Sequence, residues 1–274
     1  MALSGRLAII AGGLGGLGSA TALALRKHSA RVALLYAPFE APRRDAALTS
    51  AFGSASPPDI RTYECDITSE SSVQSTFSSL ASDATTDTSF PSILVNAAGY
   101  VSVQPLESTS ANEAMRNFLP NLLGPLVVSN AWYKLYKARK ALALEKGDAA
   151  PPGRIVSISS QASHLALDGH GAYCASKAGL NGLTRCQANE WGRDGVTANT
   201  VSPTVALTVL GKKAWAEGKM RDDHLARIPA GRFVTPEEVA GVIEFLCRDE
   251  SGMVNGGDVR IDGGFTTSGG FTVR

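Results

Sequence analysis

The chain has 274 residues and a formal net charge of +1, from 26 basic and 25 acidic residues. This balance gives no electrostatic basis for binding nucleic acid or an anionic membrane surface. Apolar residues make up 44% of the chain and charged residues 19%, which is enough apolar material for a large buried core. No apolar run approaches the ~20 residues that a membrane helix requires. The first six residues have no basic segment ahead of an apolar one, so we expect no signal peptide.

The four cysteines are scattered along the chain and form no C-x-x-C pair: Cys65, Cys174, Cys186 and Cys247. This spacing is typical neither of a cysteine metal site nor of a secreted disulfide scaffold. We therefore expect a cytoplasmic protein with reduced thiols and no metal.

Short apolar runs alternate with amphipathic segments. Residues 7–11 predict a buried strand, residues 16–27 a helix and residues 31–36 a second strand, and later apolar runs contain residues 93–95 and 154–158. Continuous apolar runs indicate strands that are buried on both faces, as in parallel sheets covered by helices. The repeated strand–helix order predicts a doubly wound α/β fold.

Three segments interrupt this pattern. Residues 50–58 and 81–91 are rich in Ser, Thr, Ala and Pro and predict surface loops, while residues 145–153 end a long helix before the next strand. None resembles an interdomain linker, and the strand–helix order continues across all three. We therefore expect residues 1–274 to form a single domain.

A glycine cluster, Gly12-Gly13-Leu14-Gly15-Gly16-Leu17-Gly18, follows the first predicted strand. It satisfies both G-x-G-x-x-G and G-x-x-x-G-x-G. Glycines allow a tight turn and let the backbone approach a pyrophosphate, which the N-terminus of the next helix attracts. Such a cluster can be only a turn, but its position between a strand and a helix favours dinucleotide binding.

The end of the second strand indicates which dinucleotide is bound. A carboxylate there would hold the ribose 2′-hydroxyl of NAD, and a nearby arginine would accept the 2′-phosphate of NADP. The strand ends at Tyr36 without a carboxylate, and Glu40, Arg43 and Arg44 follow. We favour NADP(H) slightly over NAD(H), although both arginines can equally belong to a solvated helix start.

A second motif combines a hydroxyl, a phenol and an ammonium group. Ser160 closes the apolar run at 154–158, and Tyr173 and Lys177 lie four positions apart, on one face of a predicted helix. A nearby cation favours phenolate, so we expect Lys177 to lower the pKa of Tyr173. Ser160 would hold a substrate oxygen beside the phenol. A Tyr-x-x-x-Lys pair alone is more often a surface pair, but here it accompanies the glycine cluster.

With these motifs the chain resembles the short-chain dehydrogenase/reductase family over essentially its whole length. The matching pieces are Gly12–Gly18, Asp66-Ile67, Asn96-Ala97-Ala98-Gly99, Asn121, Ser160, Tyr173-Cys174-Ala175-Ser176-Lys177, Asn199 and Pro203. The resemblance implies a Rossmann-type sheet of about seven strands, an NAD(P)-dependent oxidoreductase and a homotetramer.

The resemblance also implies roles for individual residues. Tyr173 would be the general acid/base, Lys177 would hold the nicotinamide ribose and depress the tyrosine pKa, and Ser160 would position the substrate oxygen. Asn121 would support a water-linked proton relay. The implied cofactor-binding residues are Gly12, Gly16, Leu17, Gly18, Tyr36, Asp66, Ile67, Asn96, Ala97, Gly99, Tyr173, Lys177, Pro203, Val205 and Thr208. Simpler interpretations remain: Asp66 as a helix cap and Asn121 as a buried hydrogen bonder.

Three departures from the family pattern leave the catalytic groups in place: Ala11, Ala97 and Thr204 stand where threonine, asparagine and glycine are usual. The segments 202–215 and 227–233 are similar to the dicarbonyl/L-xylulose reductases and the tetritol and pentitol dehydrogenases. That branch implies substrate contacts from Ser160, Gln161, His170, Tyr173 and Trp215. Alternatively, the histidine caps a helix and the tryptophan packs a loop.

The resulting prediction is an oxidoreductase that transfers a hydride between nicotinamide and a small ketose or dicarbonyl and its polyol. The alternatives are a broad carbonyl or 3-oxoacyl reductase and a non-catalytic NAD(P)-binding regulator. A regulator needs no proton donor, so the intact Ser160, Tyr173, Lys177 and Asn121 argue against it.

Two further expectations concern mobility and assembly. The segment 205–232 mixes apolar and charged residues and is predicted to close over substrate as a lid; the alternative is a permanently docked helix pair. The helices around residues 112–144 and 173–191 are expected to pack against partner copies. The apolar residues of the last segment, Phe265, Phe271 and Val273, are expected to be buried against another subunit.

Overall fold

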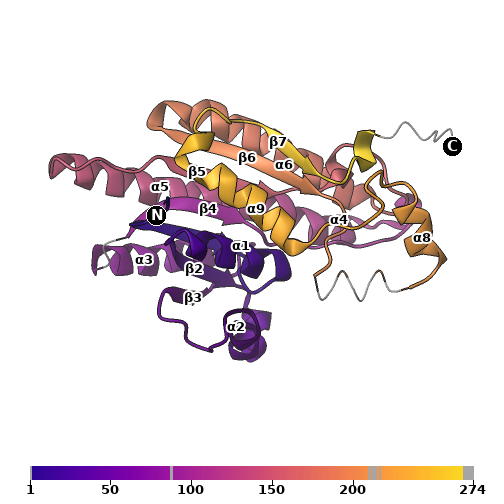
Figure 1. Cartoon of the computed structure of the whole chain (residues 1–274), viewed down its shortest axis with the longest axis horizontal. Helices are drawn as coiled ribbons and strands as arrows, with labels where there is room; N and C mark the ends of the chain where they lie inside the picture. The colour runs from indigo at the N-terminus through magenta and orange to yellow at the C-terminus, as the bar shows by residue number, and fades with distance from the viewer. Residues whose placement is uncertain (1, 87–88, 209–210, 212–214, 216, 268–274) are drawn as a thin grey trace.

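The computed structural model describes residues 2–86, 89–208, 211, 215 and 217–267. Its centre is one seven-stranded sheet in the order β3-β2-β1-β4-β5-β6-β7, and every neighbouring pair is parallel. The strands are β1 Arg6–Ala11, β2 Arg31–Tyr36, β3 Ile60–Glu64, β4 Phe90–Asn96, β5 Gly153–Ile158, β6 Val196–Pro203 and β7 Asp258–Ile261. Figure 1 shows the strand arrows pointing toward the end of the molecule where α8 lies.

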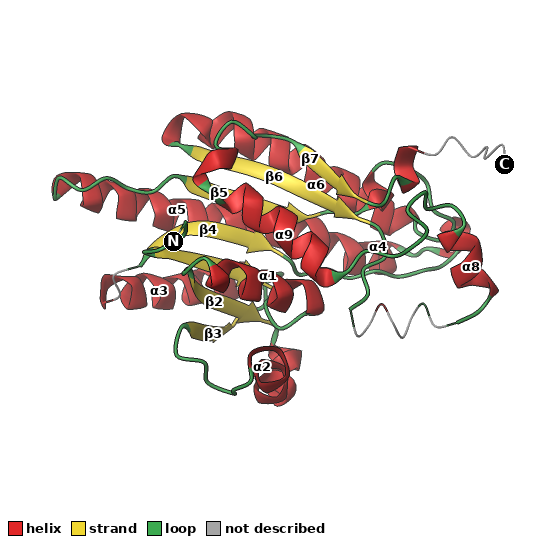
Figure 2. Cartoon of the chain, viewed as in Figure 1, coloured by secondary structure: helices red, strands yellow, loops and turns green. Residues whose placement is uncertain are grey.

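Helices cover both faces of the sheet (Figure 2). One face carries α1 Gly16–Lys27, α2 Arg44–Phe52 and α9 Pro236–Cys247, and the other carries α3 Glu70–Thr86, α5 Gly124–Glu145 and α6 Gly171–Trp191. The shorter helices are α4 Ala111–Phe118 and α8 Lys219–Leu225. No helix of the described part of the chain is long and apolar enough to cross a membrane.

The strands β1 to β6 each contribute to two apolar layers because successive side chains point to opposite faces. Ile10 of β1 packs in the layer that contains Leu25 of α1 and Ile243 of α9. Its neighbour Ile9 packs in the layer that contains Trp132 of α5. All five side chains are fully buried. This two-sided burial explains the continuous apolar runs and confirms the doubly wound α/β prediction.

One predicted loop, at 81–91, is wrong over most of its length, and another, at 50–58, is wrong at its start. Residues 81–86 belong to α3 and β4 begins at Phe90, so most of the segment 81–91 is regular structure; α2 likewise extends to Phe52. The Ser- and Thr-rich composition of α3 suggested a loop, but Val73, Phe77 and Leu80 recur at helical spacing and are buried against the sheet. Tertiary packing of this stripe outweighs the weak helix propensity of serine and threonine.

The amino ends of the central strands are fastened by Arg6, whose side chain is 4% exposed. Its Nε donates to Ser92 Oγ of β4 at 2.7 Å and its Nη2 to the Pro152 carbonyl at 2.7 Å. Its Nη1 reaches Asp249 Oδ1, just after α9, at 3.2 Å. One buried guanidinium therefore joins three segments that are distant in sequence, at the edge of the sheet opposite to the cavity described next.

Candidate active site

A cavity of about 1010 Å³ opens at the carboxyl ends of the strands. Its walls come from the start of α1, the segments that follow β4, β5 and β6, and the region around α8. Ligands in open α/β sheets bind at this edge, where the chain crosses from one face of the sheet to the other. Here β1 and β4 are neighbours, and the helices that follow them, α1 and α5, lie on opposite faces.

The glycine loop next to this cavity has no space for side chains. Gly12 has a φ of +79°, and a Cβ there would lie 2.5 Å from the Ala98 nitrogen. A Cβ on Gly18 would lie 2.3 Å from the Gly12 carbonyl oxygen, and one on Gly16 would lie 2.6 Å from Thr208 Cγ2. The bare backbone at the N-terminus of α1 fits the pyrophosphate of a dinucleotide, because the free amides of a first helical turn attract anions.

The end of β2 carries a small polar network. Glu40 is buried; its Oε2 accepts from the Ala37 amide at 3.0 Å and its Oε1 from Arg43 Nη2 at 2.7 Å. Arg44, at the start of α2, contacts Asp45 and the Tyr36 phenol, and these contacts raise the pKa of its guanidinium. The buried Glu40 carboxylate is therefore held by the Ala37 amide and by the Arg43 guanidinium.

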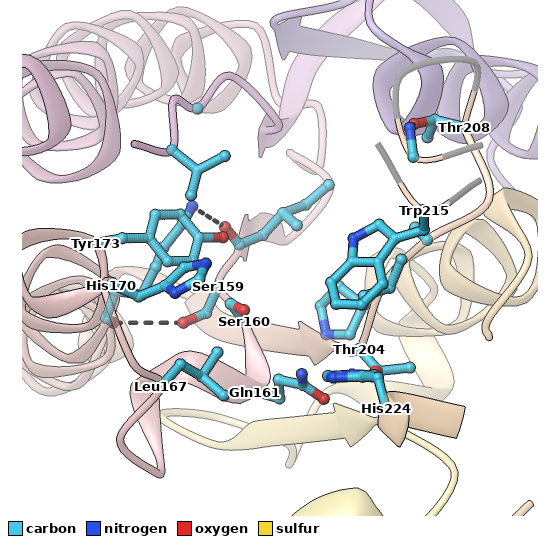
Figure 3. A pocket seen from close by; sticks show the side chains of 18 of the residues that line it. Ser159, Ser160, Gln161, Leu167, His170, Tyr173, Thr204, Thr208, Trp215 and His224 are labelled. Atoms are coloured by element: carbon cyan, nitrogen blue, oxygen red, sulfur yellow. Dashed lines mark hydrogen bonds between the residues drawn. The ribbon is translucent and has the colours of Figure 1, made fainter. Parts of the chain in front are cut away.

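Ser160, Tyr173 and Lys177 come together at the cavity wall. Ser160 precedes a 3₁₀ turn, η4 Gln161–Ser163, and its Oγ accepts from the Ala162 amide at 3.2 Å. Tyr173 and Lys177 lie one turn apart on α6, with the Lys177 Nζ 5.9 Å from the centre of the phenol ring. Figure 3 shows Tyr173 beside Ser159 and Ser160.

Burial dominates the electrostatics of this group. It raises the pKa of the Tyr173 phenol, and a hydrogen bond with Ser160 opposes it in part. The expectation that Lys177 lowers this pKa is wrong for the structure as it stands. The Lys177 Nζ donates instead to the Ile158 carbonyl at 2.8 Å, and burial lowers the pKa of this ammonium to about 8.

Asn121 lies in a π-helical turn, η3 Leu119–Leu123, between α4 and α5. Its side chain is fully buried and bonds to both the amide and the carbonyl of Tyr100 at 2.8 Å, and to Ser176 Oγ at 3.0 Å. A Cβ on Gly99 would lie 3.1 Å from Asn121 Oδ1 and 3.6 Å from Lys177 Nζ. Gly99 therefore leaves the space between these two polar groups open.

The predicted substrate residues Gln161, His170 and Trp215 all line the cavity. His170 stands at the N-cap position before α6, but its side chain makes no capping hydrogen bond. Its Nδ1 lies 2.7 Å from the Asp168 carbonyl oxygen. Its ring meets that of Tyr173 edge-on at 6.3 Å. Trp215 borders the cavity and also packs against the rings of His224 and Phe233. Its packing role is therefore observed, and its contact with substrate stays a prediction.

Several predicted cofactor residues lie outside the cavity lining. Asp66 forms a local turn in which its Oδ1 accepts from the Thr68 amide at 2.9 Å, so it does not cap α3 directly. Ile67 packs against Gly124. Asn96 is buried within the sheet and donates to Ser157 Oγ at 3.0 Å. In this structure these three residues contact other parts of the protein and do not line the cavity.

Many lining residues are not among the predicted site residues, and Thr204 and His224 are two of them. Thr204 was noted only as a departure from the family pattern, and His224 was not singled out at all. Both lie along the cavity, where Figure 3 shows them on the side of Trp215. Thr204 could have been found from its position after a strand end. Nothing in the neighbourhood of His224 in the sequence indicates its role, because only the fold brings α8 to the cavity.

The chain is similar to known proteins in both sequence and structure. A family model described as enoyl-(acyl carrier protein) reductase matches residues 12–266. The chain is 38% identical to D-threitol dehydrogenase of Mycolicibacterium smegmatis, over 96% of this chain and 94% of that protein. It is 33% identical to L-xylulose reductase of Bos taurus, over 96% and 97%. A solved structure from Beutenbergia cavernae, named as an NAD(P)-dependent gluconate 5-dehydrogenase with bound NADP at low occupancy, has a TM-score of 0.81 at 28% identity, covering 97% and 99%.

Proposed function

Because the chain belongs to the short-chain dehydrogenase/reductase family, we propose that it interconverts a small ketose or dicarbonyl and the corresponding polyol. The observation that carries this proposal is the convergence of Ser160, Tyr173 and Lys177 on one cavity wall. A serine, a phenol and an ammonium in this arrangement suit proton transfer to or from a secondary alcohol oxygen.

The family binds NAD(P), and the residues of this chain fit such a cofactor. The collisions that a Cβ would make at Gly12, Gly16 and Gly18 leave a bare backbone for the pyrophosphate. A bound nicotinamide would supply or accept the hydride. For the adenosine end we propose NADP(H), since Arg44 lies beside Tyr36 and Arg43 is largely exposed, at 61% of its side chain.

The proposed proton donor for ketone reduction is the Tyr173 phenol. Its pKa lies above the ordinary value because of burial, so the group carries its proton at neutral pH. The Ser160 hydroxyl, which bonds with the phenol, holds the substrate oxygen next to it. Lys177 and Asn121, which both lie close to Gly99, provide polar groups for a path that returns a proton to the phenol.

The substrate class is supported by the relatives and by the lining of the cavity. The similar proteins named above are a threitol dehydrogenase and a xylulose reductase. Gln161 and His170 offer hydrogen-bonding groups, and Trp215 offers an apolar surface for a carbon chain.

The deciding experiment is a grid of nicotinamide absorbance assays. NADPH and NADH are each combined with xylulose, erythrulose, diacetyl and an acetoacetyl thioester. We expect the hydroxylated ketones and NADPH to give the highest kcat/KM. Preference for the thioester would replace this proposal with a 3-oxoacyl reductase, and binding of the dinucleotide without turnover of any ketone would leave a cofactor-binding regulator.

A further inference from the structure

Three polar atoms around the cavity lack hydrogen-bond partners among the described residues: Gln161 Oε1, Thr204 Oγ1 and His224 Nε2. The side chains of Gln161 and Thr204 are almost fully buried, at 4% and 6% exposure. A buried polar atom without a partner costs about 1–3 kcal/mol, so each such atom calls for an explanation. All three residues line the same cavity, and a ligand that hydrogen-bonds there would remove the cost for all of them.

The position of His224 is set by aromatic packing. Its ring stacks on Phe265 with centres 4.8 Å apart and planes at 19°, and it lies 4.7 Å from the Trp215 ring. Phe265 is itself fastened in a tight turn, because Asp262 accepts hydrogen bonds from the amides of Gly264 at 3.0 Å and Thr266 at 2.9 Å. The histidine ring is therefore held by stacking on Phe265 and by a tilted contact with Trp215, while its Nε2 is left without a hydrogen-bond partner among the described residues.

The chemistry of these groups is neutral. Burial, and then the nearby Arg227 cation, lower the pKa of His224 below its ordinary value, so the imidazole is uncharged at neutral pH. An amide oxygen, a hydroxyl and a neutral imidazole nitrogen can each bond to an alcohol hydroxyl. Together they form a short row of partners for a neutral chain that carries several hydroxyl groups.

Figure 3 shows Tyr173 and His170 on one side of the cavity and Trp215 and His224 on the other. Proton transfer belongs to the first side. Building on the proposed function, we propose that His224, Thr204 and Gln161 form a second subsite, which binds the hydroxyl groups of the substrate beyond the reacting carbon. This subsite makes the cavity selective for polyhydroxylated ketones over simple dicarbonyls.

The test compares two ketones in three variants. Erythrulose carries hydroxyl groups and diacetyl carries none. His224→Phe keeps the ring that stacks on Phe265 but removes its nitrogen atoms, and Thr204→Val keeps the shape but removes the hydroxyl. His28→Gln is the matched control, because His28 pairs with Glu244 and does not line the cavity.

We expect His224→Phe and Thr204→Val each to lower kcat/KM for erythrulose by about 3- to 10-fold, the size of one net hydrogen bond. The loss should come mainly through KM, while the value for diacetyl stays unchanged. His28→Gln should alter neither. The subsite would be overturned if a variant that folds loses kcat/KM equally for both ketones. It would also be overturned if such a variant loses kcat/KM for neither ketone.

Failure of the proposed function gives a different result. In that case the unaltered chain reduces neither ketone with either cofactor. The subsite is then tested by calorimetric titration of the NADP-loaded protein with threitol. Binding that His224→Phe weakens supports the subsite, and absence of threitol binding overturns it.

Discussion

Tyr173 and Lys177 lie on one face of α6, yet burial shifts their pKa values in opposite directions: upward for the phenol and downward, to about 8, for the ammonium. In both cases burial favours the neutral form. At neutral pH the phenol therefore keeps its proton. The ammonium remains charged, but its pKa of about 8 lies close to neutral pH. The proposed acid is thus ready for ketone reduction, while the cation beside it is sensitive to alkaline conditions.

Replacing Tyr173 with phenylalanine removes the proposed proton donor and little else. We expect turnover to fall by at least the ~10²–10⁴-fold that general acid catalysis contributes, with cofactor affinity nearly unchanged. Steady-state rates and a fluorescence titration with NADPH measure the two quantities. Near-normal activity would remove Tyr173 from the catalytic assignment.

The alkaline sensitivity of Lys177 gives a second prediction. Below pH 8 the ammonium is protonated, and above it the charge is lost, so kcat/KM for ketone reduction should fall as the pH rises through about 8. In Lys177→Arg the guanidinium stays charged, so the fall of the residual activity should move to higher pH. An unchanged midpoint in that variant would assign the titration to another group.

At the scale of elements, the site depends on segments that follow strands. The glycine loop follows β1, the Glu40 network follows β2, and Ser160 follows β5. Each segment is short and tied to the sheet by backbone contacts, such as the bonds from the Gly12 and Gly13 amides to the Leu35 carbonyl at 3.0 Å. The sheet therefore orders the polar groups before any ligand arrives.

The segment after β2 carries the prediction on cofactor choice. Arg43→Ala combined with Arg44→Ala should weaken NADPH binding about tenfold or more, since hydrogen bonds to a charged phosphate contribute roughly 1.5–3 kcal/mol. NADH lacks the 2′-phosphate and serves as the internal control, with unchanged affinity. An unchanged dissociation constant for NADPH would refute the arginine interpretation.

The predicted lid around residues 205–232 includes α8. Residues 209–210, 212–214 and 216, with Leu210, Lys212 and Lys213 among them, lie outside the described residues. Among the described ones, Leu225 and Trp215 pack on the cluster of Ile228, Phe233 and Phe265. We expect α8 amides to exchange quickly in the free protein and more slowly with NADP and a polyol bound. Slow exchange in both states would identify a docked helix.

At the scale of the whole molecule, several apolar side chains remain exposed. Met115, Leu123 and Leu126, on α4, the π turn and α5, are 45%, 40% and 36% exposed, and on the opposite layer Phe245 of α9 is 44% exposed. Exposed apolar groups on outer helices fit surfaces that partners cover. Met115, Leu123 and Leu126 lie within the segment 112–144, which is predicted to pack against partner copies, whereas α9 is not part of that prediction.

Light scattering at micromolar concentration tests that assembly. We expect the mass of four copies of the chain. Leu123→Lys and Leu126→Lys together should shift the mass downward without unfolding the monomer, because both side chains are partly exposed already. A monomeric mass for the unaltered chain would contradict the prediction.

The expectation that another subunit buries Phe265 is wrong, because Phe265 is already buried within its own chain, at 3% exposure, beside Ile228 and Phe233. Phe271 and Val273 lie outside the described residues.

The sequence predicts those parts of the site that local sequence patterns encode. The glycine loop, the Tyr173–Lys177 spacing and the apolar strands are each encoded within a few residues of one another, and the structure places them as the patterns indicate. Two other features depend instead on the three-dimensional surroundings of a residue. The direction of the Tyr173 pKa follows from burial, and the position of His224 follows from its stacking on Phe265, 41 positions further along the chain. Neither can be derived from spacing.

Because the turn at Phe265 supports His224, the substrate side of the cavity is completed later in biosynthesis than the glycine loop. The chain is translated from its N-terminus at about 5–20 residues per second, so the glycine loop, the first lining segment, is made early. The far wall depends on Phe265, which is translated 247 residues after Gly18. A nascent chain can thus present its dinucleotide loop while the substrate wall is still missing. Whatever stability a polyol gives to the fold is available only after Phe265 has been translated.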